Sequence, residues 1–257
     1  RVGYLSQDFR DHSVAHFLKP ILAHHNRALY EPVLYSSTAQ PDATTRELAA
    51  AAAGFVDASR MPDQALDQRI HGDRVDILVD LSGHTAGSRV ALMARRPAPV
   101  LVTYLGYPNT TGIKAVGYRI VDEITDPAGA EAFATEKLTR LPGCFLCYQP
   151  PADAPDPQPS PSLAAGHVTF GSFNAVEKLV EPVIQTWAEI LNSVAGSRMI
   201  VKNLALSSAP VQEQLRARFA EAGVDPNRVE LLSRIEDPRG HLGLYGRVDV
   251  ALDTFPY

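Results

Sequence analysis

Short apolar segments alternate with amphipathic segments of helical length along almost the whole chain. Val, Ile and Leu dominate the apolar segments with little strict alternation, which is typical of strands covered on both faces. The pattern predicts strands at Val2–Ser6, Pro32–Ser36, Val75–Leu81, Val100–Leu105, Tyr118–Val121, Val168–Ser172, Arg198–Lys202, Arg228–Ser233 and Asp249–Asp253. It predicts helices at Ser13–His25, Thr44–Ala53, Pro62–His71, Pro182–Val194, Pro210–Ala222 and Pro238–Gly246. This order indicates right-handed βαβ units in doubly wound parallel sheets, an α/β fold.

A proline-rich stretch at residues 149–166 interrupts the alternation. Its prolines cannot donate to a sheet and favour extended chain, so we interpret it as a linker. It separates a Rossmann-like N-terminal domain at 1–148 from a C-terminal domain at 167–257. The second domain stops in mid-pattern at Tyr257, and the first opens directly in a strand without an initiator Met. We therefore expect an excerpt of a longer protein, with the second domain incomplete.

Composition narrows the class of protein further. The chain has 257 residues, of which 45% are hydrophobic and 21% charged, and this length suits one large or two modest domains with their own cores. No run approaches the roughly 20 apolar residues that cross a bilayer, so no membrane span is predicted. A net charge of −5 argues against a general nucleic-acid-binding protein.

The two cysteines are too few for a disulfide scaffold and favour a reducing compartment, such as the cytoplasm. Cys144 and Cys147 have the C-x-x-C spacing, but no second pair is present to complete a zinc site. The segment that contains them reads as a strand, on which residues three apart point to opposite faces. We expect two buried thiols and no metal site.

Candidate chemistry is sought where parallel strands end, because ligands of open α/β sheets bind outside the carboxyl ends of the strands. After the first strand, Asp8 and His12 come just before a predicted helix start at Ser13. Either side chain has the chemistry of a general base, and the helix start would favour an anion. The alternative is structural: Asp11 or Ser13 caps the helix, and His12 shares a face with a second histidine four residues later.

Two further loops of the first domain are rich in turn residues. The loop at 82–87 places His84 between two glycines, and the loop at 105–112 contains Leu105, Gly106 and Pro108. Both compositions suit close approach of the backbone to a ligand, and both also suit ordinary turns. Neither loop fits the Gly-x-x-x-x-Gly-Lys-Ser/Thr or Gly-x-Gly-x-x-Gly pattern, which disfavours P-loop enzymes and nicotinamide oxidoreductases.

The second domain offers lysines and a histidine. Lys178 follows the first strand of this domain, near the next helix start, where it is well placed for phosphate oxygens, although a lone surface lysine is the alternative. Asn174 lies in the same loop, and Lys202 ends the next predicted strand. His241 lies in the predicted helix that precedes the last predicted strand. Two Rossmann-like domains whose loops face a cleft would suit transfer from a nucleotide-activated donor, without naming that donor.

Several longer motifs then occur in a fixed order. They are Arg1-Val-Gly-Tyr-Leu-Ser-x-Asp8-Phe9, Arg96-Pro-Ala-Pro99 followed by Leu105-Gly-Tyr-Pro108, Gly171-Ser-Phe-Asn174 with Lys178, and Leu252-Asp-Thr-Phe-Pro-Tyr257. In these motifs the whole chain resembles the catalytic region of the protein O-GlcNAc transferase / SPINDLY family. The stretches 75–85, 106–112 and 141–148 are most similar to the SPINDLY branch and its bacterial relatives.

The resemblance implies a B-type glycosyltransferase fold with two Rossmann-like domains facing a cleft. It implies an inverting enzyme that transfers a sugar from a nucleotide sugar to Ser/Thr hydroxyls of acceptor proteins without a required metal or other cofactor. Tetratricopeptide helices are expected upstream of such a region. By resemblance, Asp8, His12 and Lys178 are the catalytic residues, and Lys178 neutralises the donor diphosphate. The residues implied to bind the donor are His84, Leu105, Gly106, Pro108, Asn174, Lys202 and His241.

The resemblance leaves several alternatives open. UDP-GlcNAc is the first-choice donor, and GDP-fucose is the second because the SPINDLY-like motifs favour fucose. Ala175 stands where animal O-GlcNAc transferases carry a donor-contacting Gln. A sugar-nucleotide epimerase of similar fold is disfavoured by Lys178 and the Leu-Gly-Tyr-Pro motif. A non-catalytic nucleotide-sugar-binding fragment is the remaining alternative.

Overall fold

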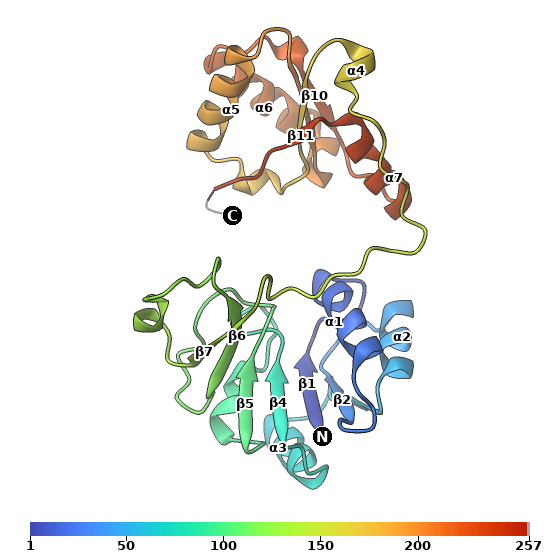
Figure 1. Cartoon of the computed structure of the whole chain (residues 1–257), viewed down its shortest axis with the longest axis vertical. Coiled ribbons are helices and arrows are strands. Elements are labelled where there is room, and N and C mark those ends of the chain that lie inside the picture. Colours follow the sequence, from blue (N-terminus) through green and yellow to red (C-terminus); the bar gives the residue numbers. More distant parts are fainter. Residues whose placement is uncertain (256–257) are drawn as a thin grey trace. The chain divides into compact units, whose positions relative to one another are not determined.

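The computed structural model describes residues 1–255, except for the side chain of Pro238. The chain divides into two compact units, unit 1 at Arg1–Gln149 and unit 2 from Pro150 onward (Figure 1). The expectation that the two face each other across a cleft stays a prediction.

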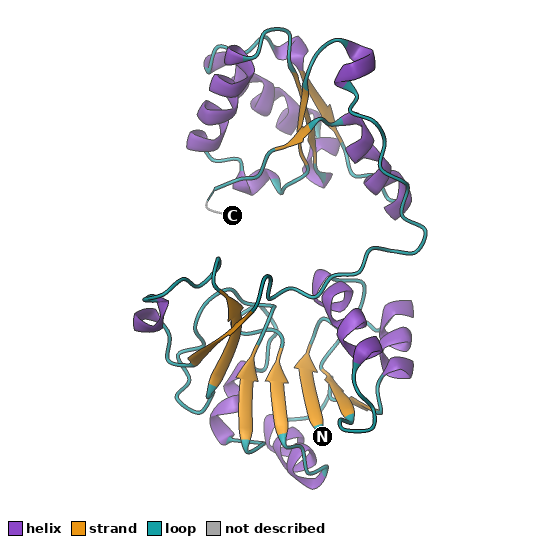
Figure 2. Cartoon of the chain, in the orientation of Figure 1, coloured by secondary structure: helices purple, strands orange, loops and turns teal. Residues whose placement is uncertain are grey.

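Unit 1 is built on a seven-stranded parallel sheet in the order β3-β2-β1-β4-β5-β6-β7 (Figure 2). The chain starts in the middle of the sheet, winds outward to β3, returns to β4 beside β1 and then winds to the other edge. The loops after β1 and β4 therefore leave neighbouring strands at the topological switch point, where such sheets bind ligands. The strands are β1 Val2–Ser6, β2 Pro32–Ser36, β3 Gly54–Asp57, β4 Ile77–Asp80, β5 Val100–Thr103, β6 Tyr118–Asp122 and β7 Lys137–Leu141.

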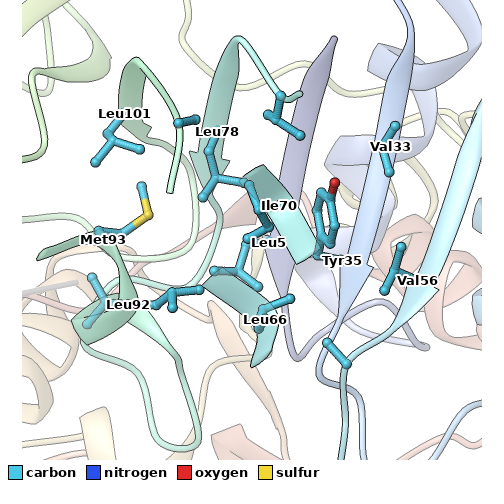
Figure 3. Packing of buried hydrophobic residues seen from close by; sticks show 14 of the residues in the cluster. Leu5, Val33, Tyr35, Val56, Leu66, Ile70, Leu78, Leu92, Met93 and Leu101 are labelled. Atoms are coloured by element: carbon cyan, nitrogen blue, oxygen red, sulfur yellow. The ribbon is translucent and has the colours of Figure 1, made fainter. Parts of the chain in front are cut away.

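Hydrophobic cores lie on both faces of this sheet. On one face, β-strand residues such as Leu5 and Leu78 pack against Leu66 and Ile70 of α3 (Asp63–Gly72) and against the 3₁₀ helix Val90–Arg95 (Figure 3). On the other face lie α1 (Ser13–His24) and α2 (Ala43–Ala51). Coverage on both faces explains the continuous apolar character of the central strands.

Unit 2 repeats the arrangement with a four-stranded parallel sheet in the order β10-β9-β8-β11. Its core packs one face of the sheet against α5 and α6, and the switch point lies between β8 and β11. The strands are β8 Thr169–Ser172, β9 Arg198–Lys202, β10 Val229–Leu232 and β11 Val250–Ala251. The helices are α4 Ser162–Ala165, α5 Glu181–Ser193, α6 Ala209–Glu221 and α7 Pro238–Gly243, and a 3₁₀ turn at Leu244–Arg247 follows α7.

The α/β class with parallel sheets is confirmed, but two strands were missed by the hydrophobic pattern. These are β3 and β7, and both are edges of the sheet in unit 1. An edge strand is half exposed, and β7 (Lys-Leu-Thr-Arg-Leu) alternates accordingly instead of forming an apolar run. The search for doubly covered strands therefore passed over them.

The expected buried thiols are wrong. Cys144 and Cys147 are exposed, and the segment that carries them is a loop after β7 rather than a strand. This loop is held at its middle, because the Phe145 amide donates to Asp122 Oδ2 (2.9 Å) and the Tyr104 hydroxyl donates to the Phe145 carbonyl (2.6 Å). Both backbone groups of Phe145 thus bond to side chains at strand ends instead of to the backbone of a neighbouring strand. Among the described residues, no helix has the length and apolarity needed to cross a membrane.

Candidate functional site

The loops after β1 and β4 are joined at the switch point of unit 1. The hydroxyl groups of Ser6 and Ser82 lie 3.2 Å apart, and both residues are buried. Gln7 crosses from the first loop to the second, where its amide donates to the Ala86 carbonyl and to Thr85 Oγ1 (3.4 Å). These polar bonds fix the positions of the two loops relative to each other.

Asp8 and His12 are brought together in the first of these loops. Asp8 is 5% exposed, and its Oδ1 lies 3.3 Å from Arg10 Nη2 and 3.9 Å from His12 Nε2. His12 is the N-cap of α1, and its Nδ1 accepts the Val14 amide at 3.3 Å. The structural alternative, capping by Asp11 or Ser13, is therefore wrong in its residue. A neutral imidazole that accepts at Nδ1 carries its proton on Nε2, so the capping bond uses the one in-plane lone pair of the His12 ring.

A pocket of about 770 Å³ opens at the carboxyl ends of β1 and β2. It is polar, because acidic, basic and amide side chains surround it. Asp8 and Arg10 line it, so the buried carboxylate has access to a ligand-sized space. Its other lining residues are Gln7, Asp11, Ser37, Ala39, Gln40, Pro41, Asp42, Ala86 and Gly87.

Asp80, at the end of β4, organises the second loop and was not singled out from the sequence. It is completely buried, and its carboxylate accepts the amides of Gly83 (2.7 Å) and Ser82 (3.4 Å). Burial raises the pKa of Asp80 to about 6, because removing the carboxylate from water outweighs these hydrogen bonds. Asp80 lies inside the predicted strand Val75–Leu81, and the search for candidate residues covered the loops that follow strands.

The raised pKa of Asp80 predicts a pH-dependent stability. The folded carboxyl holds its proton to a higher pH than the unfolded one, so the folded state loses stability as the pH rises from about 4 to about 6. The Asp80→Asn variant lacks this loss. Between pH 4 and pH 6 its free energy of unfolding, relative to that of the unsubstituted protein, should therefore rise by up to about 3 kcal/mol. Urea titrations at pH 4, 5 and 6, read by hydrogen exchange on unit 1 peptides, measure the difference.

Asp57→Asn is the control, because its effect on stability should change with pH in the opposite direction. The pKa of Asp57 is lowered because Ser59 donates to its carboxylate, so this exposed group stabilises the folded state as the pH rises. A difference between Asp80→Asn and the unsubstituted protein that stays constant between pH 4 and 6 would contradict the raised pKa.

The third loop begins with an unusual backbone at the end of β5. Leu105 has φ 72°, in the left-handed region that branched and bulky residues rarely adopt. At Gly106, a Cβ atom would lie 1.8 Å from the Leu81 carbonyl oxygen, so only glycine fits. Tyr107 then packs on Gly83, where a Cβ would lie 2.3 Å from the Tyr107 Cβ. The strand-end loops of β4 and β5 are therefore in direct backbone contact.

Buried polar side chains hold the rest of this loop. Glu136, 4% exposed, accepts the Thr111 amide (2.8 Å), the Thr111 hydroxyl and the Thr110 hydroxyl (2.7 Å). Burial alone would raise the pKa of Glu136, but these hydrogen bonds hold it below its usual value. From the other side, His84 Nε2 donates to the Thr111 carbonyl (2.7 Å). His84 thereby keeps an unprotonated Nδ1 when neutral.

Arg119 anchors the residue that the resemblance assigned to donor binding. This buried arginine forms a two-pronged ion pair with Asp126 (3.0 and 3.1 Å) and donates to the Pro108 carbonyl at 2.9 Å. Arg119 of β6 therefore fixes the position of Pro108, and the loop is held in one conformation before any ligand binds. Neither Arg119 nor Glu136 was found from the sequence, because an isolated charge outside a motif carries no signal of burial.

In unit 2, the switch point is closed by Asn174. Its amide donates to Asp253 Oδ1 (2.8 Å), which joins the loop after β8 to the loop after β11. The Asn203 amide, from the end of β9, donates to the Asn174 carbonyl (3.2 Å). Lys178 ends the short 3₁₀ turn Val176–Lys178 that follows, and its side chain is exposed.

Lys202 and His241 meet in a cationic and aromatic cluster beside that switch point. Lys202 Nζ donates to His241 Nδ1 at 2.9 Å and lies 5.4 Å from the centre of the Phe173 ring. Phe173 and Tyr245 meet edge to face, with ring centres 4.6 Å apart. Burial, and then the charge of Arg234, lowers the pKa of Lys202; burial, and then the charge of Lys202, lowers the pKa of His241. We name Phe173, Lys202, His241 and Tyr245 the aromatic cluster.

The structure thus places every predicted site residue at the carboxyl end of a sheet or directly beside it. In unit 1 it unites Asp8 with His12, and His84 with the loop that holds Leu105, Gly106 and Pro108. In unit 2 it unites Lys202 with His241, and Asn174 with the strand ends. Phe173 and Tyr245 were missed, although the position of Phe173 directly after β8 was a signal that could have found it.

The model of the family described as glycosyl transferase family 41 matches residues 1–149, which is more than half of the chain. The chain belongs to glycosyl transferase family 41. Its two units have the B-type glycosyltransferase fold that the resemblance implied.

Relatives in family 41 match the chain along its whole length. It is 40% identical over 260 residues to the probable UDP-N-acetylglucosamine–peptide N-acetylglucosaminyltransferase SPINDLY of Arabidopsis thaliana and 42% identical to that of Solanum lycopersicum. Each match covers 100% of this chain and 28% of the relative. The Arabidopsis thaliana SEC protein, with the same enzyme name, is 31% identical over 99% of this chain and 26% of its own length. The chain therefore spans about a quarter of these relatives.

Solved structures agree. A lysine-to-methionine variant of Thermobaculum terrenum O-GlcNAc transferase matches with a TM-score of 0.94 and 36% identity, covering 100% of this chain and 48% of that one. Anabaena HepE in complex with UDP and glucose matches with a TM-score of 0.52 and 12% identity, over 97% of this chain and 72% of that one. The second likeness concerns the fold alone.

Proposed function

We propose that this chain is the catalytic region of an inverting protein O-glycosyltransferase that transfers GlcNAc from UDP-GlcNAc to Ser/Thr hydroxyls of acceptor proteins. The observation that carries the proposal is the match to Thermobaculum terrenum O-GlcNAc transferase over the whole chain. Tetratricopeptide helices upstream would be part of the full-length protein. A cytoplasmic location fits the exposed thiols of Cys144 and Cys147, which persist in reducing compartments.

The chemistry is a displacement at the anomeric carbon of the sugar. The acceptor hydroxyl oxygen forms a bond to that carbon, the bond to the diphosphate oxygen breaks, and the hydroxyl proton leaves. Lys178 stabilises the negative charge that develops on the diphosphate. Asp8 is the proton acceptor in this proposal, because the capping bond of His12 leaves that imidazole without a free lone pair. His12 Nε2 lies 3.9 Å from Asp8 Oδ1, and Arg10 Nη2 donates to the same oxygen at 3.3 Å and holds the carboxylate in place.

Donor recognition is assigned to both units. The aromatic cluster presents ring faces and a charged donor, which suit a nucleobase and its phosphates. The loop with Leu105, Gly106 and Pro108 offers backbone groups held rigidly by Arg119 and Glu136. GDP-fucose is the second candidate donor, because the SPINDLY-like motifs of the sequence favour fucose.

Intact-protein mass spectrometry tests the proposal on the full-length protein. The protein is incubated with UDP-GlcNAc or GDP-fucose in separate tubes, with a candidate acceptor and alone to detect self-modification. Addition of an N-acetylhexosamine mass is expected, and a deoxyhexose mass would replace GlcNAc by fucose. Thermal stabilisation by either nucleotide sugar without transfer would favour a non-catalytic binding protein and refute the proposed activity.

The proposed reaction needs no metal, because Lys178 supplies the charge that a divalent cation supplies in other transferases. Transfer should therefore keep its rate after treatment with excess EDTA and removal of the chelator by gel filtration. A loss of transfer that Mg²⁺ or Mn²⁺ restores would overturn this prediction.

A further inference from the structure

A second pocket lies at the opposite end of the sheet of unit 2 from the aromatic cluster. It has a volume of about 570 Å³ and is lined by the amino-terminal ends of β9 and β10. Arg198 begins β9 and Lys202 ends it, so about 13 Å of strand separates the pocket from the candidate donor site. The family resemblance and the proposed function assign nothing to this end of the sheet.

Four arginines from four segments converge on this pocket. They are Arg198 of β9, Arg216 of α6, Arg228 before β10, and Arg247 of the 3₁₀ turn after α7. Among the described lining residues, Glu230 is the single carboxylate. The chain as a whole carries a net charge of −5, so the pocket reverses the sign of the protein around it.

Two of the arginines are fixed by neutral carbonyl groups, which orient them without cancelling their charge. Arg228 donates to the Ser197 carbonyl (2.8 Å) and to the Ser197 hydroxyl (2.9 Å). Arg216 donates through Nη1 to the carbonyls of Val229 (3.0 Å) and Pro226 (3.3 Å). Both arginines are half-buried, and together with these hydrogen bonds this makes them a rigid, charged wall of the pocket.

The other two arginines supply adaptable donors. Arg247 Nη2 lies 2.6 Å from Glu230 Oε2, in an ion pair whose side chains are both about half exposed. Arg198 is exposed, and its guanidinium has no hydrogen bond or ion pair with any residue in the described part of the chain. The pocket thus keeps at least one complete set of guanidinium donors for an external anion.

We propose that this pocket binds a small organic molecule that carries phosphate groups. Guanidinium groups match phosphate oxygens in a two-pronged geometry, and several of them around one space favour more than one negative charge. The volume is in the range of small-molecule sites. Apolar atoms of Pro161, Ile200 and Pro226 line the remainder and suit the organic part of the ligand. The site is separate from the proposed donor site.

Inorganic pyrophosphate is the probe for the charged part of this ligand. Its dissociation constant is measured by calorimetry on the full-length protein in a Lys178→Ala background, which removes the lysine proposed for the donor diphosphate. We expect Arg198→Gln combined with Arg247→Gln to raise the dissociation constant at least about 10-fold, because two charge-assisted interactions are lost. Arg60→Gln combined with Arg95→Gln, two exposed arginines of unit 1, changes the net charge equally and should leave binding within about 2-fold.

Glu230→Gln provides a result of opposite sign. It removes the carboxylate that competes for Arg247, so pyrophosphate should bind about 3-fold or more tightly. A general folding defect could not produce that gain. The proposal is overturned if pyrophosphate binds more weakly than about 1 mM, if the control pair weakens binding as much as the pocket pair, or if Glu230→Gln weakens it.

Discussion

In the full-length protein, Lys178→Ala should lower the rate of sugar transfer about 10²–10³-fold while the variant remains folded. The reason is the leaving group: as the glycosidic bond breaks, negative charge builds on the diphosphate, and a preorganised ammonium is worth most at that moment. Lys178 is exposed at the end of a 3₁₀ turn just past β8, so its side chain is not part of the hydrophobic core. Initial rates at saturating donor, measured by mass spectrometry, give the effect.

Lys137→Ala is the matched control, because Lys137 is an exposed lysine of unit 1 in the edge strand β7. It should leave the rate within about 2-fold, since an isolated surface charge contributes little. Lys178→Arg keeps the positive charge with a different shape, and partial recovery of the rate is expected. Near-normal turnover by Lys178→Ala, with a mass added as before, would refute the role of this lysine while leaving the proposed activity in place.

The hydrophobic pattern predicted the central part of both sheets because burial on both faces leaves a direct trace in the sequence. β1, β2 and β9 have the predicted bounds, and each contributes side chains to a core. The edge strands β3 and β7 left no such trace, since half of their side chains face outward. The loop around Cys144 and Cys147 was misread for the converse reason. It contains apolar residues, but Phe145 packs against Tyr104 and its backbone bonds to Asp122 instead of pairing with a strand.

For the site as well, the sequence predicted what depends on local information and missed what depends on contacts between distant residues. Asp8, His84, Leu105 and Asn174 could be found because each lies in a loop that follows a strand, and the position of strand ends is local information. Glu136 contacts Thr111 across 25 residues, and His241 contacts Lys202 across 39. No spacing rule specifies such pairs. The capping role of His12 was hidden as well, because histidine is not among the preferred N-cap residues.

Gly106→Ala should give the largest loss of local stability in unit 1, about 3 kcal/mol or more. The added Cβ would lie 1.8 Å from the Leu81 carbonyl oxygen and 2.8 Å from its carbon, and both are backbone atoms of the adjoining strand end. No flexible side chain is present to move aside, so the loop after β5 must separate from the loop after β4. Hydrogen exchange of peptides from these two loops should accelerate, and sugar transfer should fall with it.

Two other glycines separate this clash from general effects of alanine. At Gly117, φ is ordinary and the nearest atom to a Cβ is 3.8 Å away, so Gly117→Ala should be neutral within about 0.5 kcal/mol. At Gly112, φ is +67° with open space around it, so Gly112→Ala should cost about 1 kcal/mol through backbone strain alone. The expected order is therefore Gly106 far above Gly112, and Gly112 above Gly117. If Gly106→Ala exchanges no faster than Gly112→Ala, the two strand ends are not in contact, and the loop that carries Leu105 and Pro108 is not held in the position on which the donor assignment depends.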